Sequence, residues 1–163
     1  PPVAIGVVTK YDITKYGKRL ILLDNIQDPG NLGTIIRSAC AFNIDTIILS
    51  STCVDLFNPK TIRATEGMMF HIDIMRLDLL PLCDELKENN YELLGTNVIN
   101  GQPLNKIKFT DKFAIVIGSE GKGISPELRK KITDNIYIPM NNKCAGKIII
   151  NTRTLKECRA FIL

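Results

Sequence analysis

The sequence is poor in the side chains that most often carry metal or nucleophilic chemistry. Its 163 residues include one histidine, His71, and no tryptophan, and no two of its five cysteines form a C-x-x-C pair. Zinc sites and histidine-assisted nucleophiles need clusters of such residues. The sequence therefore predicts neither a metal site nor a histidine-based nucleophile mechanism, and we interpret His71 as a structural residue.

Disulfide frameworks and membrane spans are also not expected. The cysteines are odd in number and scattered along the chain, at Cys40, Cys53, Cys83, Cys144 and Cys158, which argues against a disulfide framework and favours a reducing compartment. No apolar run reaches the roughly 20 residues that a membrane-spanning helix needs, and the first ten residues, PPVAIGVVTK, lack the features of a signal peptide. We expect a protein of the cytoplasm or of an organelle, without a membrane partner.

The length and the hydrophobic content are those of one compact domain. The chain is 45% hydrophobic, and a chain of this size can bury most of the surface that it exposes when unfolded. Its formal net charge is +4. That charge permits contact with nucleic acid but does not demonstrate it, because dedicated nucleic-acid-binding domains are often more basic.

The stretch from Leu23 to Ala41 predicts a strand, a tight turn and a helix. An apolar run ends in acidic and amide residues, the turn sequence D-P-G-N follows, and apolar residues then recur at helical spacing. We expect Asn31 to cap the helix. Arg37 interrupts the apolar stripe within two turns of Asn31, so both side chains could address a ligand at the carboxyl end of the strand. A simple cap and a solvated arginine would explain the same residues.

The remaining pattern predicts an α/β domain with a mostly parallel sheet and helices on both faces. Continuous apolar runs at 46–50 and 113–117 are typical of buried parallel strands. Apolar residues at helical spacing predict a helix at 79–89, and Asn58-Pro59 predicts a turn followed by a short helix that ends by Gly67. Further strands are expected at 71–75, 92–96 and 135–138, a loop at 97–108, and a helix beginning with Ser125 as cap and Pro126.

A glycine turn follows the strand expected at 113–117. Its sequence, G-S-E-G-K-G from Gly118 to Gly123, has the order G-x-x-G-x-G, which is neither the dinucleotide fingerprint nor a P-loop. A nicotinamide-dependent oxidoreductase is therefore disfavoured. The glycines allow close approach of the backbone to a ligand, with Glu120 beside it, although a plain turn would explain them equally well.

Several segments together resemble one family. The run D-P-G-N-L-G-T-I-I-R-S-A resembles the first motif of the SpoU (TrmH) branch of the SPOUT RNA methyltransferases, and V-I-G-S-E-G-K-G-I-S resembles the second motif at nearly every position. The segment N-P-K-T-I-R-A-T-E-G resembles the family pattern N-P-K-x-x-R-A-S-x-G, and I-P-M matches the opening of the third motif. The resemblance covers roughly residues 20–143.

This resemblance implies an enzyme that uses S-adenosylmethionine to methylate ribose 2′-hydroxyls of ribosomal or transfer RNA, with no metal. It further implies a C-terminal trefoil knot and a homodimer. The catalytic residues would be Asn31, Arg37 and Glu120, with Arg37 acting as a base or as a stabiliser of the developing alkoxide or the adjacent phosphate. The cofactor would contact Thr96, Gly118, Gly121, Ile138, Pro139 and Met140, and RNA phosphates would contact Lys60, Arg63 and Lys122. From the residues alone, a solvated basic face explains Lys60 and Arg63 as well.

The resemblance also divides the chain and ends before its last residues. Residues 1–19 would be a linker or edge strand after a missing N-terminal RNA-binding domain, and residues 20–163 the catalytic domain. After Lys143 the family continues into Ser-Leu-Asn and a helix of small residues, whereas this chain reads C-A-G-K-I-I-I-N-T-R-T-L-K-E-C-R-A-F-I-L. This altered third motif predicts weak binding of S-adenosylmethionine. The alternative function is a non-catalytic RNA-binding module of the same fold that has lost the cofactor through its altered C-terminus.

Overall fold

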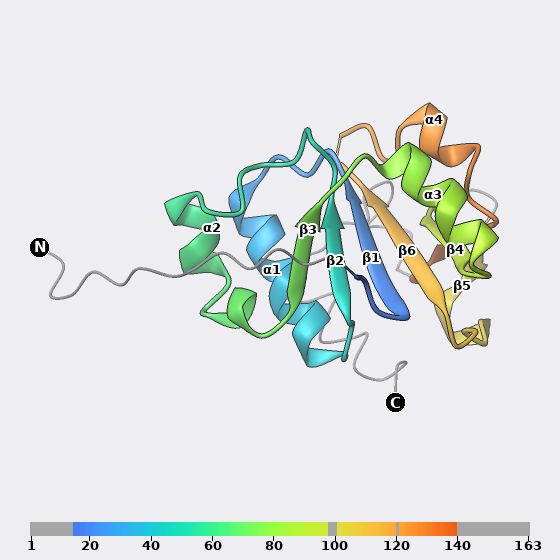
Figure 1. The fold of residues 1–163 in the computed structure, drawn as a ribbon, viewed down its shortest axis with the longest axis horizontal. Helices are drawn as coiled ribbons and strands as arrows, with labels where there is room; N and C mark the ends of the chain where they lie inside the picture. Colours follow the sequence, from blue (N-terminus) through green and yellow to red (C-terminus); the bar gives the residue numbers. More distant parts are fainter. Residues whose placement is uncertain (1–14, 98–100, 120, 140–163) are drawn as a thin grey trace, which may run out of the picture.

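The computed structural model describes residues 15–97, 101–119 and 121–139, and within them seven strands form one sheet (Figure 1). The strand order is β3-β2-β1-β6-β4-β7-β5, and neighbouring strands run parallel. The strands are β1 (Arg19–Asp24), β2 (Thr46–Leu49), β3 (Asp73–Arg76), β4 (Glu92–Thr96), β5 (Gln102–Pro103), β6 (Phe113–Gly118) and β7 (Asp134–Tyr137). The helices are α1 (Pro29–Ala41), α2 (Pro59–Ala64), α3 (Leu79–Glu88) and α4 (Pro126–Arg129), with short 3-10 turns η1 (Met68–Phe70) and η2 (Leu104–Lys106).

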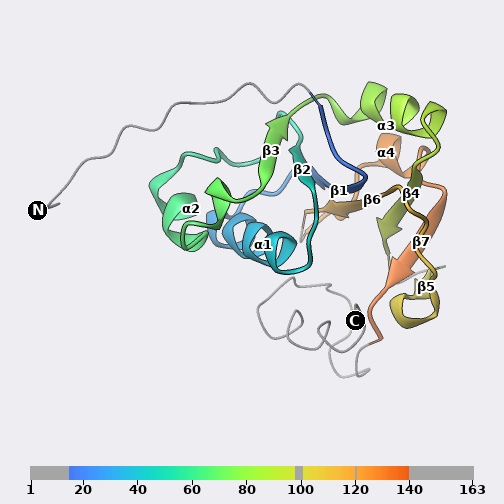
Figure 2. The same cartoon turned by 60° about the horizontal axis from the view of Figure 1, so that its bottom comes forward.

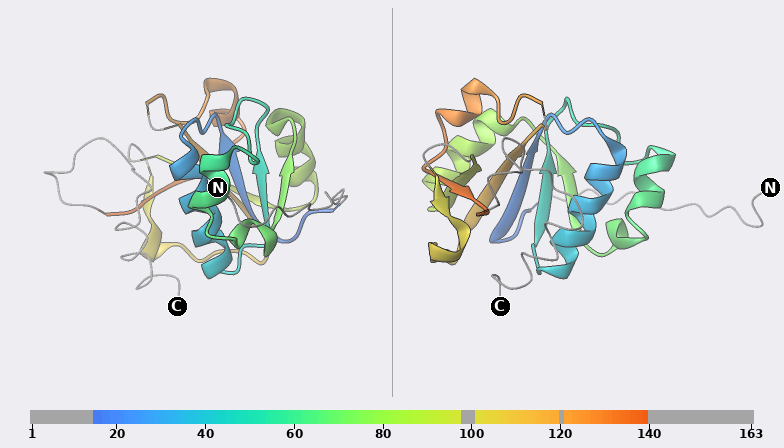
Figure 3. Two further views of the ribbon diagram at one scale, coloured as in Figure 1. Left: turned by 90° about the vertical axis from the view of Figure 1, so that its left-hand side faces the viewer. Right: turned by 180° about the vertical axis from the view of Figure 1, so that it is seen from behind.

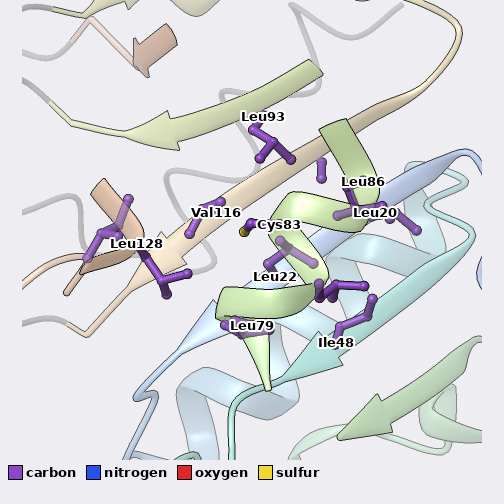
Figure 4. Close-up of a cluster of buried hydrophobic side chains, with 12 residues drawn as sticks. Leu20, Leu22, Ile48, Leu79, Cys83, Leu86, Leu93, Val116 and Leu128 are labelled. Atoms are coloured by element: carbon purple, nitrogen blue, oxygen red, sulfur yellow. The ribbon is translucent and has the colours of Figure 1, made fainter. Parts of the chain in front are cut away.

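Helices cover both faces of this sheet, as the sequence predicted. Successive side chains of a strand point to opposite faces, so Leu20 and Leu22 of β1 pack with α3 and α4, whereas Ile21 and Leu23 pack with α1. Figure 2 shows α3 and α4 on one side of the sheet and α1 and α2 on the other, and Figure 4 shows the cluster beneath α3. Because β1 is buried on both faces, its sequence is a continuous apolar run rather than an alternating one.

The prediction that Asn31 caps the first helix is wrong. The carboxylate of Asp28 caps α1, accepting a hydrogen bond from the backbone N–H of Asn31 at 2.7 Å, and the helix begins at Pro29. Proline suits the first helical position because its φ is already helical and it has no N–H to satisfy. A carboxylate at a helix N-terminus is also favoured by the helix dipole. Asn31 therefore lies in the first turn of α1.

Smaller differences occur at element boundaries. The strand expected at 71–75 begins at Asp73, because Met68–Phe70 form η1 and His71 ends it. The expected loop at 97–108 contains β5 and η2, and the strand expected at 135–138 begins and ends one residue earlier, as β7. Ser125 precedes α4 as predicted, but its side chain makes no capping hydrogen bond.

Several predictions lie outside the described residues. They are the edge strand or linker before residue 15, the site residues Glu120 and Met140, and the departure from the family pattern after Lys143.

The connections of β1 and β6 define where a ligand would bind in this sheet. The chain leaves β1 through α1 on one face to reach β2, and it leaves β6 through α4 on the other face to reach β7. Since β1 and β6 are neighbours, the order of the sheet reverses between them. Open α/β sheets bind ligands at the carboxyl ends of strands beside such a reversal. The start of α1 and the glycine turn after β6 both lie at this edge.

Candidate active site

Helix α1 carries both Asn31 and Arg37. Asn31 is half-buried in the first turn, and Arg37 lies further along the same helix with 39% of its side chain exposed. The Nη1 atom of Arg37 is 2.9 Å from Oε1 of Glu66, which follows α2. The sequence did not predict this ion pair. Its carboxylate comes from the segment after α2.

The segment α2–η1 packs along α1 (Figure 3), and close contacts flank the ion pair in both directions along the chain. On one side, a Cβ added at Gly33 of α1 would lie 2.4 Å from Cβ of Ala64, so only glycine permits this approach of the helices. On the other side, the thiol of Cys40 donates a hydrogen bond to the carbonyl of Met68 at 3.4 Å. The path of the chain around Glu66 is therefore fixed relative to Arg37.

The predicted RNA-binding cations are exposed but come from two elements. Lys60 and Arg63 lie on α2, three residues apart and so on one face of the helix. The side chain of Asn58 begins this helix, accepting the backbone N–H of Lys60 at 2.9 Å. Lys122 belongs to the glycine turn after β6. All three ammonium or guanidinium groups are accessible to a polyanion.

The glycine turn folds back against the end of β6. A Cβ at Gly118 would lie 2.1 Å from backbone atoms of Gly123 and Ile124, and the N–H of Gly123 donates to the carbonyl of Ser119 at 2.8 Å. Gly123 itself has a left-handed φ of 68°, which favours glycine. Gly118 and Gly123 are thus required by the turn's own geometry. Around Gly121, by contrast, no atom of the described chain lies within 4 Å of an added Cβ, so its backbone is accessible to a ligand.

Asp24 attaches this turn to the end of β1. Its side chain is 7% exposed, and Oδ2 accepts a hydrogen bond from the backbone N–H of Ser125 at 2.7 Å. The two residues are 101 positions apart in sequence. Sequence analysis missed this role, although an acidic residue at the end of a buried apolar strand was a usable signal, since buried carboxylates are normally hydrogen-bonded.

Removing this anchor should destabilise the domain. Asp24→Ala leaves the N–H of Ser125 without its acceptor, and we expect the free energy of unfolding to fall by about 1–3 kcal/mol. Urea unfolding measures the change. Asp134→Ala, at the exposed first residue of β7, is the matched control and should unfold near the wild-type midpoint. Equal midpoints for the two variants would show that the Asp24 hydrogen bond does not hold the turn.

The predicted cofactor residues that the structure describes lie at or just after the ends of three neighbouring strands. β6, β4 and β7 are adjacent and parallel, so Gly118, Thr96 and the residues that follow β7 lie at one edge of the sheet. The hydroxyl of Thr96 donates to the carbonyl of Val116 at 3.1 Å. Ile138 is half-buried and Pro139 exposed. Backbone polar groups at strand ends, an open backbone at Gly121 and the apolar Ile138 suit an adenosine moiety, which needs hydrogen-bond partners and an apolar contact.

A pocket of about 290 Å³ lies beside this edge, at the carboxyl ends of β1 and β2. It is lined by Asp24, Ser50, Ser51, Thr52, Leu77, Asp78, Leu79, Leu80, Ser125, Glu127 and Leu128. None of the predicted site residues lines it. Its charged groups are all carboxylates, which repel phosphate groups, so we do not assign it to RNA or to the predicted cofactor.

The described residues offer little material for metal or thiol chemistry. In the described ranges, no three His, Cys, Asp or Glu side chains are grouped closely enough to hold a metal ion. Burial raises the pKa of the Cys83 thiol to about 11, so this side chain is a neutral core residue at physiological pH. Burial also raises the pKa of Cys40. In the same part of the chain, no helix is long and apolar enough to cross a membrane.

The fold and the site together define an α/β protein with a ligand-binding edge built from a strand–turn–helix unit and a glycine turn. The model of the SpoU rRNA Methylase family matches residues 18–146. The chain therefore belongs to the SpoU methylase family, in agreement with the resemblance found in the sequence.

Relatives and solved structures support this assignment. The chain is 40% identical over 123 residues to the 23S rRNA (guanosine(2553)-2′-O)-methyltransferase RlmP of Bacillus subtilis, which covers 76% of this chain and 50% of that protein. An rRNA methyltransferase from Sinorhizobium meliloti with bound AdoMet has a TM-score of 0.78 at 28% identity, covering 91% of this chain and 58% of that one. The SpoU methyltransferase AviRb from Streptomyces viridochromogenes, also in complex with AdoMet, has a TM-score of 0.74 at 25% identity over 89% of this chain and 58% of that one. The chain thus spans about half the length of the curated relative.

Proposed function

We propose that this protein is an S-adenosylmethionine-dependent ribose 2′-O-methyltransferase that acts on ribosomal or transfer RNA. The observation that carries the proposal is that α1, which bears Asn31 and Arg37, begins at the sheet edge where the glycine turn after β6 also lies. Two findings support it. A relative of 40% identity is named a 2′-O-methyltransferase, and two solved relatives contain AdoMet.

The residues of this chain would position the reactants and stabilise charge. When bound, S-adenosylmethionine supplies an electrophilic methyl group for an in-line displacement, which needs aligned reactants. A guanidinium is a poor base, so we assign Arg37 to stabilising the developing alkoxide or the adjacent phosphate, while the proton of the ribose hydroxyl would pass to solvent water. The amide of Asn31 both donates and accepts hydrogen bonds, and it would orient the ribose. Glu120 would assist from the glycine turn.

The wider features of the family belong to the same proposal. We infer that the chain completes a C-terminal trefoil knot, which would be an exception to the rule that chains are unknotted. We also propose a homodimer and residence in the cytoplasm or an organelle. The predicted linker role is proposed only for residues before Tyr16, because Tyr16 packs against the core and Arg19 begins β1.

The proposal is tested by incubating the full chain with labelled S-adenosylmethionine and ribosomal or transfer RNA. We expect label in the RNA, and calorimetry should detect the cofactor when titrated to millimolar concentrations, which covers the weak binding predicted from the altered third motif. RNA binding without cofactor heat or label would instead support the non-catalytic RNA-binding module. Absence of RNA binding and of cofactor binding would contradict both functions.

RNA binding should be weak and salt-sensitive, because the net charge is modest and the predicted cations contact phosphates. Replacing all three cations with alanine should reduce the slope of log affinity against log salt by about 2, given a slope of about 0.7 per phosphate contact on single strands. Filter binding at several salt concentrations measures the slope. The matched control replaces three other exposed lysines, Lys87, Lys106 and Lys130. Equal slopes for the two triple variants would contradict the assignment of Lys60, Arg63 and Lys122.

A further inference from the structure

We propose that Glu66 is a positioning residue that holds the guanidinium of Arg37 in the orientation needed for methyl transfer. This inference rests on the proposed function and assigns a role to a residue that neither the motifs nor the resemblance includes. Glu66 stands at a variable position of the family pattern N-P-K-x-x-R-A-S-x-G, so the resemblance gives it no role.

The geometry of the ion pair favours orientation over stability. Arg37 and Glu66 have side chains that are 39% and 65% exposed, and an exposed ion pair contributes little to folding. The contact engages one guanidinium nitrogen, Nη1, at 2.9 Å. A guanidinium is a planar fork with five N–H donors. Holding one nitrogen therefore restricts the directions in which the remaining donors can point.

The backbone at Glu66 is unusual for an acidic residue. Its φ is +48°, in the left-handed region, and Gly67 follows at +84°. A non-glycine residue with positive φ is uncommon, because the Cβ atom then lies too close to the following carbonyl oxygen. Such strain persists only where the surroundings impose it, and it tends to occur at functional positions.

The surroundings of Glu66 do impose that conformation. The preceding residue, Thr65, is fully buried, and its hydroxyl donates to the carbonyl of Ile62 at 2.8 Å. The N–H of Glu66 donates to the carbonyl of Arg63 at 3.2 Å. Ala64, which packs closely against Gly33 of α1, precedes Glu66 in the chain. Met68, whose carbonyl accepts the hydrogen bond from the thiol of Cys40, follows it. The carboxylate is therefore presented to Arg37 by a rigid segment fixed to α1 at both ends.

Three variants separate a positioning role from a structural one. In Glu66→Asn the new side chain tolerates the left-handed backbone but is shorter and uncharged. Glu66→Gln keeps the length of the side chain and removes its charge. Glu88→Gln, the matched control, removes an exposed carboxylate at the end of α3. Single-turnover rates at saturating RNA and S-adenosylmethionine are measured together with the affinity for each. Signals of the ¹⁵N-labelled Arg37 guanidinium, assigned with Arg37→Lys, report its rotation directly.

We expect Glu66→Asn to lower the single-turnover rate about tenfold, since small displacements of a positioned group cost about one to two orders of magnitude. Glu66→Gln should lower the single-turnover rate less than Glu66→Asn does, and Glu88→Gln should leave it unchanged. In all three variants the affinities for RNA and cofactor should stay within about twofold of the wild type. Rotation of the Arg37 guanidinium should be hindered in the wild type and free in Glu66→Asn.

Other results would overturn the inference. Wild-type rates in both Glu66 variants would show that Arg37 needs no partner there, and an equal loss of RNA affinity and rate would make Glu66 a binding or structural residue. A wild-type chain that transfers no methyl group to RNA would overturn the proposed function and this inference together, so the two failures are distinguishable.

Discussion

Arg37→Ala is expected to reduce methyl transfer to RNA about 100- to 1,000-fold while the protein remains folded. Loss of one preorganised charge-stabilising group typically costs that much in rate. The side chain of Arg37 is partly exposed and its ion pair with Glu66 is on the surface, so the free energy of unfolding should change by no more than about 1 kcal/mol. Affinity for S-adenosylmethionine should also persist, because the predicted cofactor residues lie on other elements.

The measurement is the single-turnover rate, with urea unfolding and calorimetry on the same preparations. Arg37→Lys keeps the charge but loses the planar fork, and it should recover only part of the rate. Arg19→Ala is the control, since Arg19 is also ion-paired, to Asp45 at 2.7 Å, but lies at the opposite end of β1 from the site. A folded Arg37→Ala protein with near-normal turnover would rule out the role assigned to this residue.

Gly118→Ala is expected to displace the glycine turn and remove cofactor binding. The added Cβ would lie 2.1 Å from backbone atoms of Gly123 and Ile124, which cannot rotate away as a flexible side chain could. Overpacking of this kind costs about 1–3 kcal/mol of stability. The turn carries the backbone that would contact S-adenosylmethionine, so we expect its affinity to fall beyond detection by calorimetry.

Gly121→Ala provides the matched comparison within the same turn. No described atom lies within 4 Å of the added Cβ at Gly121, so stability should stay at the wild-type value. Any loss of cofactor affinity in this variant would then result from contact between the added Cβ and the cofactor rather than from a change in the fold. If Gly118→Ala retained both the wild-type urea midpoint and the wild-type affinity, the turn would have to accommodate a side chain by a movement that the structure does not indicate.

The fold was largely predictable because buried parallel strands leave a strong signal. β1 and β6 are continuous apolar runs, and β1 is buried on both faces whereas β6 is buried on one face and half-buried on the other. The helical spacing of α3 predicted its limits within one residue. The capping residue of α1 was predicted wrongly because two nearby residues could serve as the cap. Asp28 and Asn31 are both good capping residues, and the proline between them decided for Asp28. The two-residue strand β5 was missed because an edge pairing so short carries no periodicity.

The candidate site was predictable where it depends on local motifs and not where it depends on packing. Asn31 and Arg37 lie on one helix, as the local sequence pattern predicted, and their roles in a site stay a prediction. Glu66 reaches Arg37 only because Gly33 lets α2 approach α1, and Asp24 meets Ser125 across the sheet. Gly33, a glycine inside a helical pattern, was the available signal that another element approaches α1 closely. Nothing in the sequence identified α2 as that element.

The position of the transferred methyl group tests the central claim most directly. RNA incubated with the chain and saturating S-adenosylmethionine is digested to nucleosides, and mass spectrometry distinguishes ribose methylation from base methylation. We predict new 2′-O-methylated nucleosides with the wild-type chain, and their formation at least about 100-fold more slowly with Arg37→Ala. Base-methylated nucleosides, or no modified nucleoside although the cofactor binds, would contradict the proposed activity.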